Sequence, residues 1–139
     1  MSVMRSLLVL AALGSLGCGD SATPTSPTTT ASTLSTVLFS GTLQPRATRF
    51  YSYTMTSAGQ VSAMLASLER GATPVTNSLE LGLGIPAGTG CAASVTSMTN
   101  TSLIPQLKQE SSAGTYCVRI SDTDGLPGPM NFTIRLVHP

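Results

Sequence analysis

The chain is 139 residues long, which is enough for one folded domain together with a targeting segment and a linker. Only 9% of its residues are charged and the formal net charge is +1, so the chain lacks the clustered lysines and arginines that a nucleic-acid-binding surface requires. Beyond the N-terminal leader, no run of about 18 apolar residues predicts a membrane-spanning helix.

The leader, residues 1–17, has the pattern of a secretory signal peptide. A single cation, Arg5, precedes an apolar core at residues 7–13, and small residues follow before Cys18. This order is typical of export signals, and the apolar core is too short to span a bilayer permanently.

The residues Ser15-Leu16-Gly17-Cys18 resemble the lipobox of bacterial lipoprotein signal peptides. The resemblance implies that Cys18 becomes the first residue of the mature chain and carries thioether-linked diacylglycerol, which anchors the protein in a lipid bilayer. Ser15 departs from the family, in which an aliphatic residue is usual at this place. In similar lipoproteins an aspartate after the cysteine favours the inner membrane, so Gly19 indicates the outer membrane or the cell surface. The alternative is a secreted protein without lipid.

Residues 18–36 are expected to form a spacer between the lipid and a folded head. Threonine, serine, proline and alanine dominate residues 21–35, with one leucine and no charge. This composition offers little apolar surface to bury, and Pro24 and Pro27 favour an extended chain. We therefore expect the head to comprise residues 37–139.

From Val37 onward, apolar and polar residues alternate with the period of a β-strand. The alternation is clear in the segments RFYSYTM, QVSAMLASL, SLELGLG, GTYCVRIS and MNFTIRLVH. Turn-forming sequences separate them, namely SAGQ, ERGATP, IPAGTG, SSAG and DTDGLPGP. The pattern predicts an all-β head, an antiparallel, jelly-roll-like β-sandwich of about seven or eight strands. Residues 92–107 fit one strand, two strands, or a strand and a loop.

Three cysteines are an odd number for an exported chain. If Cys18 carries lipid, Cys91 and Cys117 remain to form a disulfide in an oxidising compartment. Because Cys117 alternates with Tyr116 and Val118, we expect this bridge on the outer face or edge of a sheet rather than in the central core. Two thiols without a third soft ligand make a poor metal site, so no metal is expected there.

Four segments of the head are similar to the bacterial pre-peptidase C-terminal domain, a β-sandwich appended to secreted proteases and other exported proteins. They read FSGTLQPRATRFYSYTM, GQVSAML, LELGLGIPAGTGCAA and SAGTYCVRISD followed by NFTIRL, and they cover residues 39–136. The family usually accompanies a catalytic domain, and none is expected in this chain. Some members carry clustered carboxylates that bind calcium, whereas Asp122 and Asp124 are the only close acidic pair here.

The side chains that could be catalytic or metal-binding fit structural roles better. Asp122-Thr123-Asp124-Gly125 begins like a calcium loop but lacks the further oxygen ligands and the distal glutamate of an EF-hand, so a tight turn is preferred. His138, the only histidine, lies beside the C-terminus, where we expect a frayed or edge-strand residue rather than a catalytic base. Glu69, Glu80 and Glu110 are far apart in sequence, although only a fold would show whether two of them face each other as in a glycosidase.

Tyr51, Tyr53 and Tyr116 alternate with the core positions and are interpreted as packing residues. Arg46 and Arg49 fit a solvated turn better than a basic contact site. The sequence therefore predicts no enzyme and no cofactor. It predicts a lipid-anchored binding or structural module of the bacterial envelope, with an unidentified protein or glycan as partner. The alternative is an accessory module of a secreted hydrolase.

Overall fold

The computed structural model describes residues 33–139, and these form an all-β head as the alternating pattern predicts. The expectations for the signal peptide, for Cys18 and for most of the spacer concern residues 1–32 and lie outside the described residues. Within the described range, no helix is long and apolar enough to cross a membrane.

Nine strands follow one another along residues 33–139. They are β1 (Ser35–Leu43), β2 (Thr48–Met55), β3 (Gly59–Arg70), β4 (Thr73–Pro74), β5 (Leu79–Ala87), β6 (Gly90–Thr99), β7 (Leu107–Ser111), β8 (Gly114–Ser121) and β9 (Met130–His138). Strand β1 begins at Ser35, two residues before the expected start of the head at Val37. The turns after β2, β3, β5, β7 and β8 overlap the predicted turn sequences, although Thr73–Pro74 of ERGATP forms the short strand β4.

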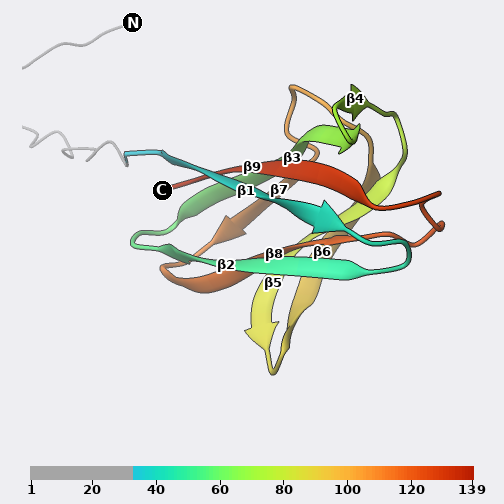
Figure 1. The fold of residues 1–139 in the computed structure, drawn as a ribbon. Coiled ribbons are helices and arrows are strands. Elements are labelled where there is room, and N and C mark those ends of the chain that lie inside the picture. The colour runs from blue at the N-terminus through green and yellow to red at the C-terminus, as the bar shows by residue number, and fades with distance from the viewer. Residues whose placement is uncertain (1–32) are drawn as a thin grey trace, which may run out of the picture. The chain divides into compact units, whose positions relative to one another are not determined.

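The strands form two antiparallel sheets packed face to face (Figure 1). One sheet has the order β1-β9-β3, with β4 and β7 both pairing to the far edge of β3. The other has the order β2-β8-β5-β6. Because β1, β2 and β3 alternate between the sheets, as do β7, β8 and β9, the connections follow the jelly-roll scheme of two interlocked Greek keys. The predicted jelly-roll-like sandwich is therefore confirmed.

The core lies between the sheets and is filled from the faces that the alternation predicts to be apolar. Its fully or nearly fully buried side chains include Tyr53, Met55, Val61, Ala63, Leu65, Leu79, Leu81, Leu83, Val118, Ile120, Phe132, Ile134 and Leu136. Tyr51 and Tyr116 are partly buried and pack against this cluster. The interpretation of the three tyrosines as packing residues agrees with these contacts.

Strand β3 contains a β-bulge that changes which of its residues face outward. Its pairing with β9 shifts between Leu65 and Ser67. The buried face therefore continues at Leu68, which is 1% exposed, while Ser67 and Glu69 turn to the outer face. Simple alternation from Leu65 would place Ser67 and Glu69 in the core.

The ambiguous segment 92–107 is a strand followed by a loop. Strand β6 continues to Thr99, a loop follows, and β7 begins at Leu107. In the loop, the backbone N–H of Ser102 donates to the carbonyl oxygen of Leu65 at 2.9 Å, and that of Gln106 donates to Ala63 at 3.0 Å. The loop thus covers the part of the β3 edge that β4 and β7 leave open, and so protects it from pairing with another chain.

The expected cysteine pair lies at disulfide distance, with sulfurs 2.03 Å apart and Cα atoms 5.9 Å apart. Cys117 lies on the opposite face of β8 from the core residue Val118, as predicted, yet its side chain is fully buried. Strand β5 pairs with β8 as far as Gly84, which lies opposite Cys117, and beyond this point β5 and β6 pair only with each other. Cys91 lies on this outer part of the β5–β6 hairpin and bonds to Cys117, which buries the Cys117 side chain.

The expectation of a frayed or edge-strand His138 is wrong. Strand β9 is the central strand of its sheet, with β1 on one side and β3 on the other. His138 is the last residue of β9, pairs with Ser35, and is only 7% exposed. Its ring lies 5.4 Å from that of Tyr53, and its Nδ1 lies 2.8 Å from the carbonyl oxygen of Pro139.

Candidate binding site on the outer face of the β1-β9-β3 sheet

The outer face of the β1-β9-β3 sheet carries two rows of polar side chains in register. Ser40 lies opposite Thr133, and Thr133 lies opposite Ser67. In the next row, Asn131 lies between Thr42 and Glu69. These positions face outward because their neighbours along β1 and β9, such as Leu43 and Phe132, face the core.

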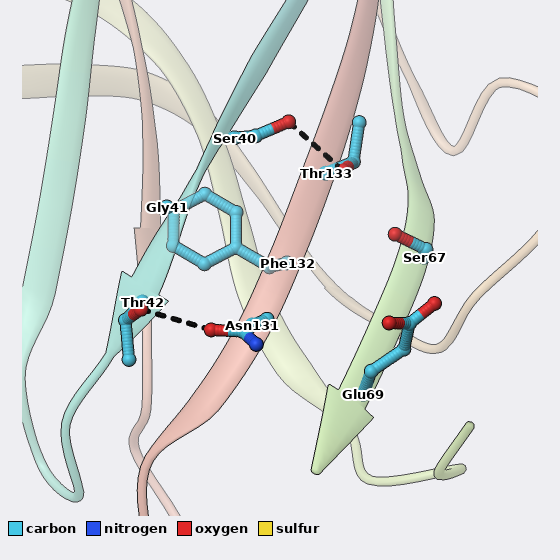
Figure 2. Close-up of a pocket in the computed structure, with 8 residues that line it drawn as sticks. All are labelled: Ser40, Gly41, Thr42, Ser67, Glu69, Asn131, Phe132 and Thr133. Atoms are coloured by element: carbon cyan, nitrogen blue, oxygen red, sulfur yellow. Dashed lines mark hydrogen bonds between the residues drawn. The ribbon is translucent and has the colours of Figure 1, made fainter. Parts of the chain in front are cut away.

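The two rows line an open hollow with a volume of about 440 Å³. We call this hollow the polar hollow; its polar lining residues are Ser40, Thr42, Ser67, Glu69, Asn131 and Thr133. Figure 2 shows their side chains above the ribbons of β1, β9 and β3. The volume is in the range of small-ligand sites.

Internal hydrogen bonds orient part of the polar hollow and leave the rest free. The hydroxyl of Thr42 donates to Oδ1 of Asn131 at 2.9 Å, which leaves the amide nitrogen of Asn131 on the side away from Thr42 (Figure 2). The hydroxyls of Ser40 and Thr133 are 3.0 Å apart. Among the described residues, the partly buried side chains of Ser67 and Glu69 make no hydrogen bond or ion pair.

The floor of the polar hollow is rigid because aromatic rings pack directly beneath it. A Cβ atom at Gly41 would lie 2.6 Å from the hydroxyl oxygen of Tyr51, so a larger residue at this position would displace the ring. The Tyr51 hydroxyl donates to the carbonyl oxygen of Ser40 at 3.0 Å. Tyr51 also stacks on Phe39, with ring centroids 4.9 Å apart, and meets Phe132 edge-on.

Asp122 has a structural role in the β8–β9 loop. Its Oδ2 accepts hydrogen bonds from the backbone N–H groups of Arg46 and Leu126, both at 2.6 Å, and its Oδ1 accepts from that of Gly125 at 2.9 Å. Burial by itself would raise the pKa of Asp122. The hydrogen bonds from these three donors and from the N–H of Asp124 together lower the pKa by more than burial raises it, so it lies below its ordinary value. With both carboxylate oxygens engaged, Asp122 stabilises the turn, which agrees with the turn interpretation.

The other acidic residues considered above lie apart. Glu80 forms an ion pair with Arg119 on the outer face of the second sheet, with Oε1 and Nη2 2.5 Å apart. Glu110, on β7, accepts a hydrogen bond from the side chain of Gln60 at 3.1 Å. Glu69 lies in the polar hollow. In residues 33–139 there is no group of three or more histidine, cysteine, aspartate or glutamate side chains arranged to hold a metal.

The arginines and tyrosines considered above lie where a structural role explains them. Arg46 is exposed in the turn between β1 and β2, as expected, although its backbone N–H binds Asp122. Arg49 is also exposed but lies on β2 rather than in the turn. Burial, together with the neighbouring Tyr116, raises the pKa of Tyr53 to about 12, so this phenol stays neutral at any physiological pH. Its ring packs between those of Tyr116 and His138.

Apart from Glu69, the residues of the polar hollow are absent from the sequence-based candidates. A weak signal existed in the alternating pairs Ser40/Thr42 and Asn131/Thr133, which lie in the segments FSGTL and MNFTIRLVH. Their convergence depends on the pairing of β1 with β9, and the contribution of Ser67 and Glu69 depends on the bulge in β3.

Comparisons with known proteins assign the chain to no group: no protein-family model matches it, and none of the curated proteins is similar to it. The similarity to the pre-peptidase C-terminal domain therefore rests on the segments quoted above and stays a prediction.

Proposed function

We propose that this protein is a lipid-anchored, non-catalytic binding module of the bacterial envelope that holds its ligand on the outer face of the β1-β9-β3 sheet. The polar hollow is the observation that carries the proposal. It gathers side chains with unused hydrogen-bonding capacity on a rigid floor, and binding sites commonly combine a concave shape with a few such groups.

The architecture also supports a binding role. The hollow is built on three adjacent strands, which hold side chains more rigidly than loops do. Its hydroxyl, amide and carboxylate groups suit recognition, whereas the one carboxylate lacks the second titratable partner that acid–base hydrolysis uses. The lipobox-like sequence at Cys18 and the spacer that precedes β1 support presentation of the head away from a membrane.

The anchoring part of the proposal is tested by substituting the lipid-bearing cysteine. We expect Cys18→Ser to abolish palmitate labelling and to move the protein from the detergent phase to the aqueous phase in a partitioning assay. Ser15→Leu, which restores an aliphatic residue to the lipobox, serves as the matched control and should label at least as well as the natural sequence. Unchanged partitioning of Cys18→Ser would show a secreted protein without lipid.

The binding part is tested with envelope material from which lipids have been extracted. We expect the purified full chain to sediment saturably with this material. Retention that does not saturate, or no retention at all, would exclude a specific binding module whatever the outcome of the lipid labelling.

A further inference from the structure

We propose that the polar hollow binds a neutral glycan by grasping two neighbouring hydroxyl groups of one sugar, with Glu69 accepting and Asn131 donating hydrogen bonds. The inference rests on the proposed function and narrows it to one class of ligand. It starts from the juxtaposition of the Glu69 carboxylate with the amide N–H groups of Asn131, which make no hydrogen bond among residues 33–139, whereas the Asn131 amide oxygen accepts from Thr42.

The register places these two side chains where they can act together. Glu69 and Asn131 are direct cross-strand partners, and such partners hold their Cβ atoms about 5 Å apart. An ionised carboxylate only accepts hydrogen bonds, whereas the free amide N–H groups of Asn131 only donate. Each hydroxyl of a sugar both donates and accepts, so a pair of neighbouring hydroxyls satisfies both side chains at once.

The remaining lining residues extend the same chemistry. Ser67 contributes a hydroxyl without a partner among the described residues, and Ser40 and Thr133 contribute hydroxyls that can exchange their mutual hydrogen bond for one to a ligand. The volume of about 440 Å³ accommodates one or two sugar rings. All polar groups in the hollow therefore match a ligand that is itself covered with hydroxyls.

The charge and composition of the hollow disfavour other ligands. Glu69 is its only charged lining residue, so an anionic ligand would be repelled. One carboxylate provides too few oxygen ligands for a calcium ion. No aromatic, methionine or arginine side chain projects into the hollow, because the Phe132 ring is 2% exposed and faces the core, and such residues usually anchor protein interfaces.

The same composition predicts weak binding to a single site. Without an exposed aromatic ring, the hollow offers a sugar no stacking surface, and we expect dissociation constants of about 1 mM. Many anchored copies on one surface would raise the overall affinity for a repeating polysaccharide, because each further contact becomes intramolecular.

The experiment is saturation-transfer NMR on the full chain in a detergent that contains no sugar. Maltohexaose, cellohexaose, mannohexaose and chitohexaose are the probes, each at about ten times the expected dissociation constant. We expect transfer to the ring protons of at least one probe. Glu69→Gln, which keeps the shape of the side chain, and Asn131→Ala should each weaken binding about tenfold.

Glu110→Gln is the matched control, because it removes a carboxylate from the same sheet outside the hollow and should leave binding unchanged. No transfer to any probe, or transfer that Glu69→Gln and Asn131→Ala leave unaltered, would overturn the glycan inference. In either case, saturable retention on envelope material would still support a binding module. Retention that protease treatment of the envelope abolishes would identify a protein partner instead.

Discussion

The carboxylate of Asp122 ties the β8–β9 loop to the connection between β1 and β2. Its hydrogen bonds from backbone N–H groups reach across 76 positions of sequence to Arg46 and also close the local turn at Gly125 and Leu126. Arg46 has a φ of 59°, in the left-handed region that non-glycine residues rarely adopt. Because a carboxylate accepts on both oxygens, it satisfies donors that a neutral side chain of the same size cannot.

We predict that Asp122→Asn destabilises the head by about 1.5–3 kcal/mol at pH 7, since the amide places an N–H group against backbone donors. The folded pKa of Asp122 is lowered, so its contribution is complete above the ordinary aspartate value of about 3.9 and is lost as the pH falls through the folded pKa. The difference in unfolding free energy between the natural and variant proteins should therefore shrink below about pH 4. Urea unfolding across this range measures it.

The exposed Asp124 supplies the control for this experiment. Asp124→Asn should change the unfolding free energy by less than about 0.5 kcal/mol at every pH. A constant difference between Asp122→Asn and the natural protein from pH 7 to pH 2 would contradict the assigned role of the carboxylate.

The outer part of the β5–β6 hairpin depends on the cysteine pair for its attachment to β8. Strand β5 pairs with β8 only from Glu80 to Gly84, and beyond that point the hairpin pairs with itself alone. Its tip is a two-residue turn with Gly88 at a φ of 58°, as a type II′ turn requires at its first position. A two-stranded hairpin is marginally stable by itself, so the link from Cys91 to β8 matters most at this tip.

We predict that replacing both Cys91 and Cys117 with serine lowers the unfolding free energy by about 3–4 kcal/mol, given their separation of 26 positions. Amide hydrogen exchange should also accelerate selectively at residues 85–92, while the backbone amides of β3 and β9 keep the same protection relative to one another. An equal loss of protection in both sheets would show that the bridge does not act through the hairpin.

The sequence predicted the elements well wherever alternation was regular. The patterns in β2, β5, β8 and β9 identified both the strands and their buried faces, because each of these strands has one face on the core. The alternation failed beyond Leu65, because the bulge adds a residue that no local pattern announces. It also could not reveal that the last strand lies in the centre of a sheet, which led to the wrong expectation for His138.

The candidate site is a product of the sheet topology. Ser40 and Thr133 meet although they are 93 positions apart, because the jelly roll brings the first and last strands side by side. A local sequence pattern does not reveal such pairings, so Glu69 stood out only as one of three glutamates that are far apart in sequence. The fold class was predictable from periodicity, whereas the polar hollow required the register of three strands.

The same topology makes β9 indispensable to the entire head. We predict that a chain ending at Pro129 shows no cooperative thermal unfolding by circular dichroism, because β1 loses its only strand partner in the described head and β3 gains an open edge. The truncation also removes fully or nearly fully buried core side chains, namely Met130, Phe132, Ile134 and Leu136.

Graded substitutions within β9 keep this prediction testable even if the truncated chain cannot be purified. Ile134→Ala, which empties a fully buried position, should retain a single cooperative transition and cost about 2–5 kcal/mol. Arg135→Ala changes the neighbouring exposed position and should cost less than about 0.5 kcal/mol. If the truncated chain unfolded cooperatively near the natural melting temperature, or if both substitutions had the same effect, β9 would not close the core as the sheet order requires.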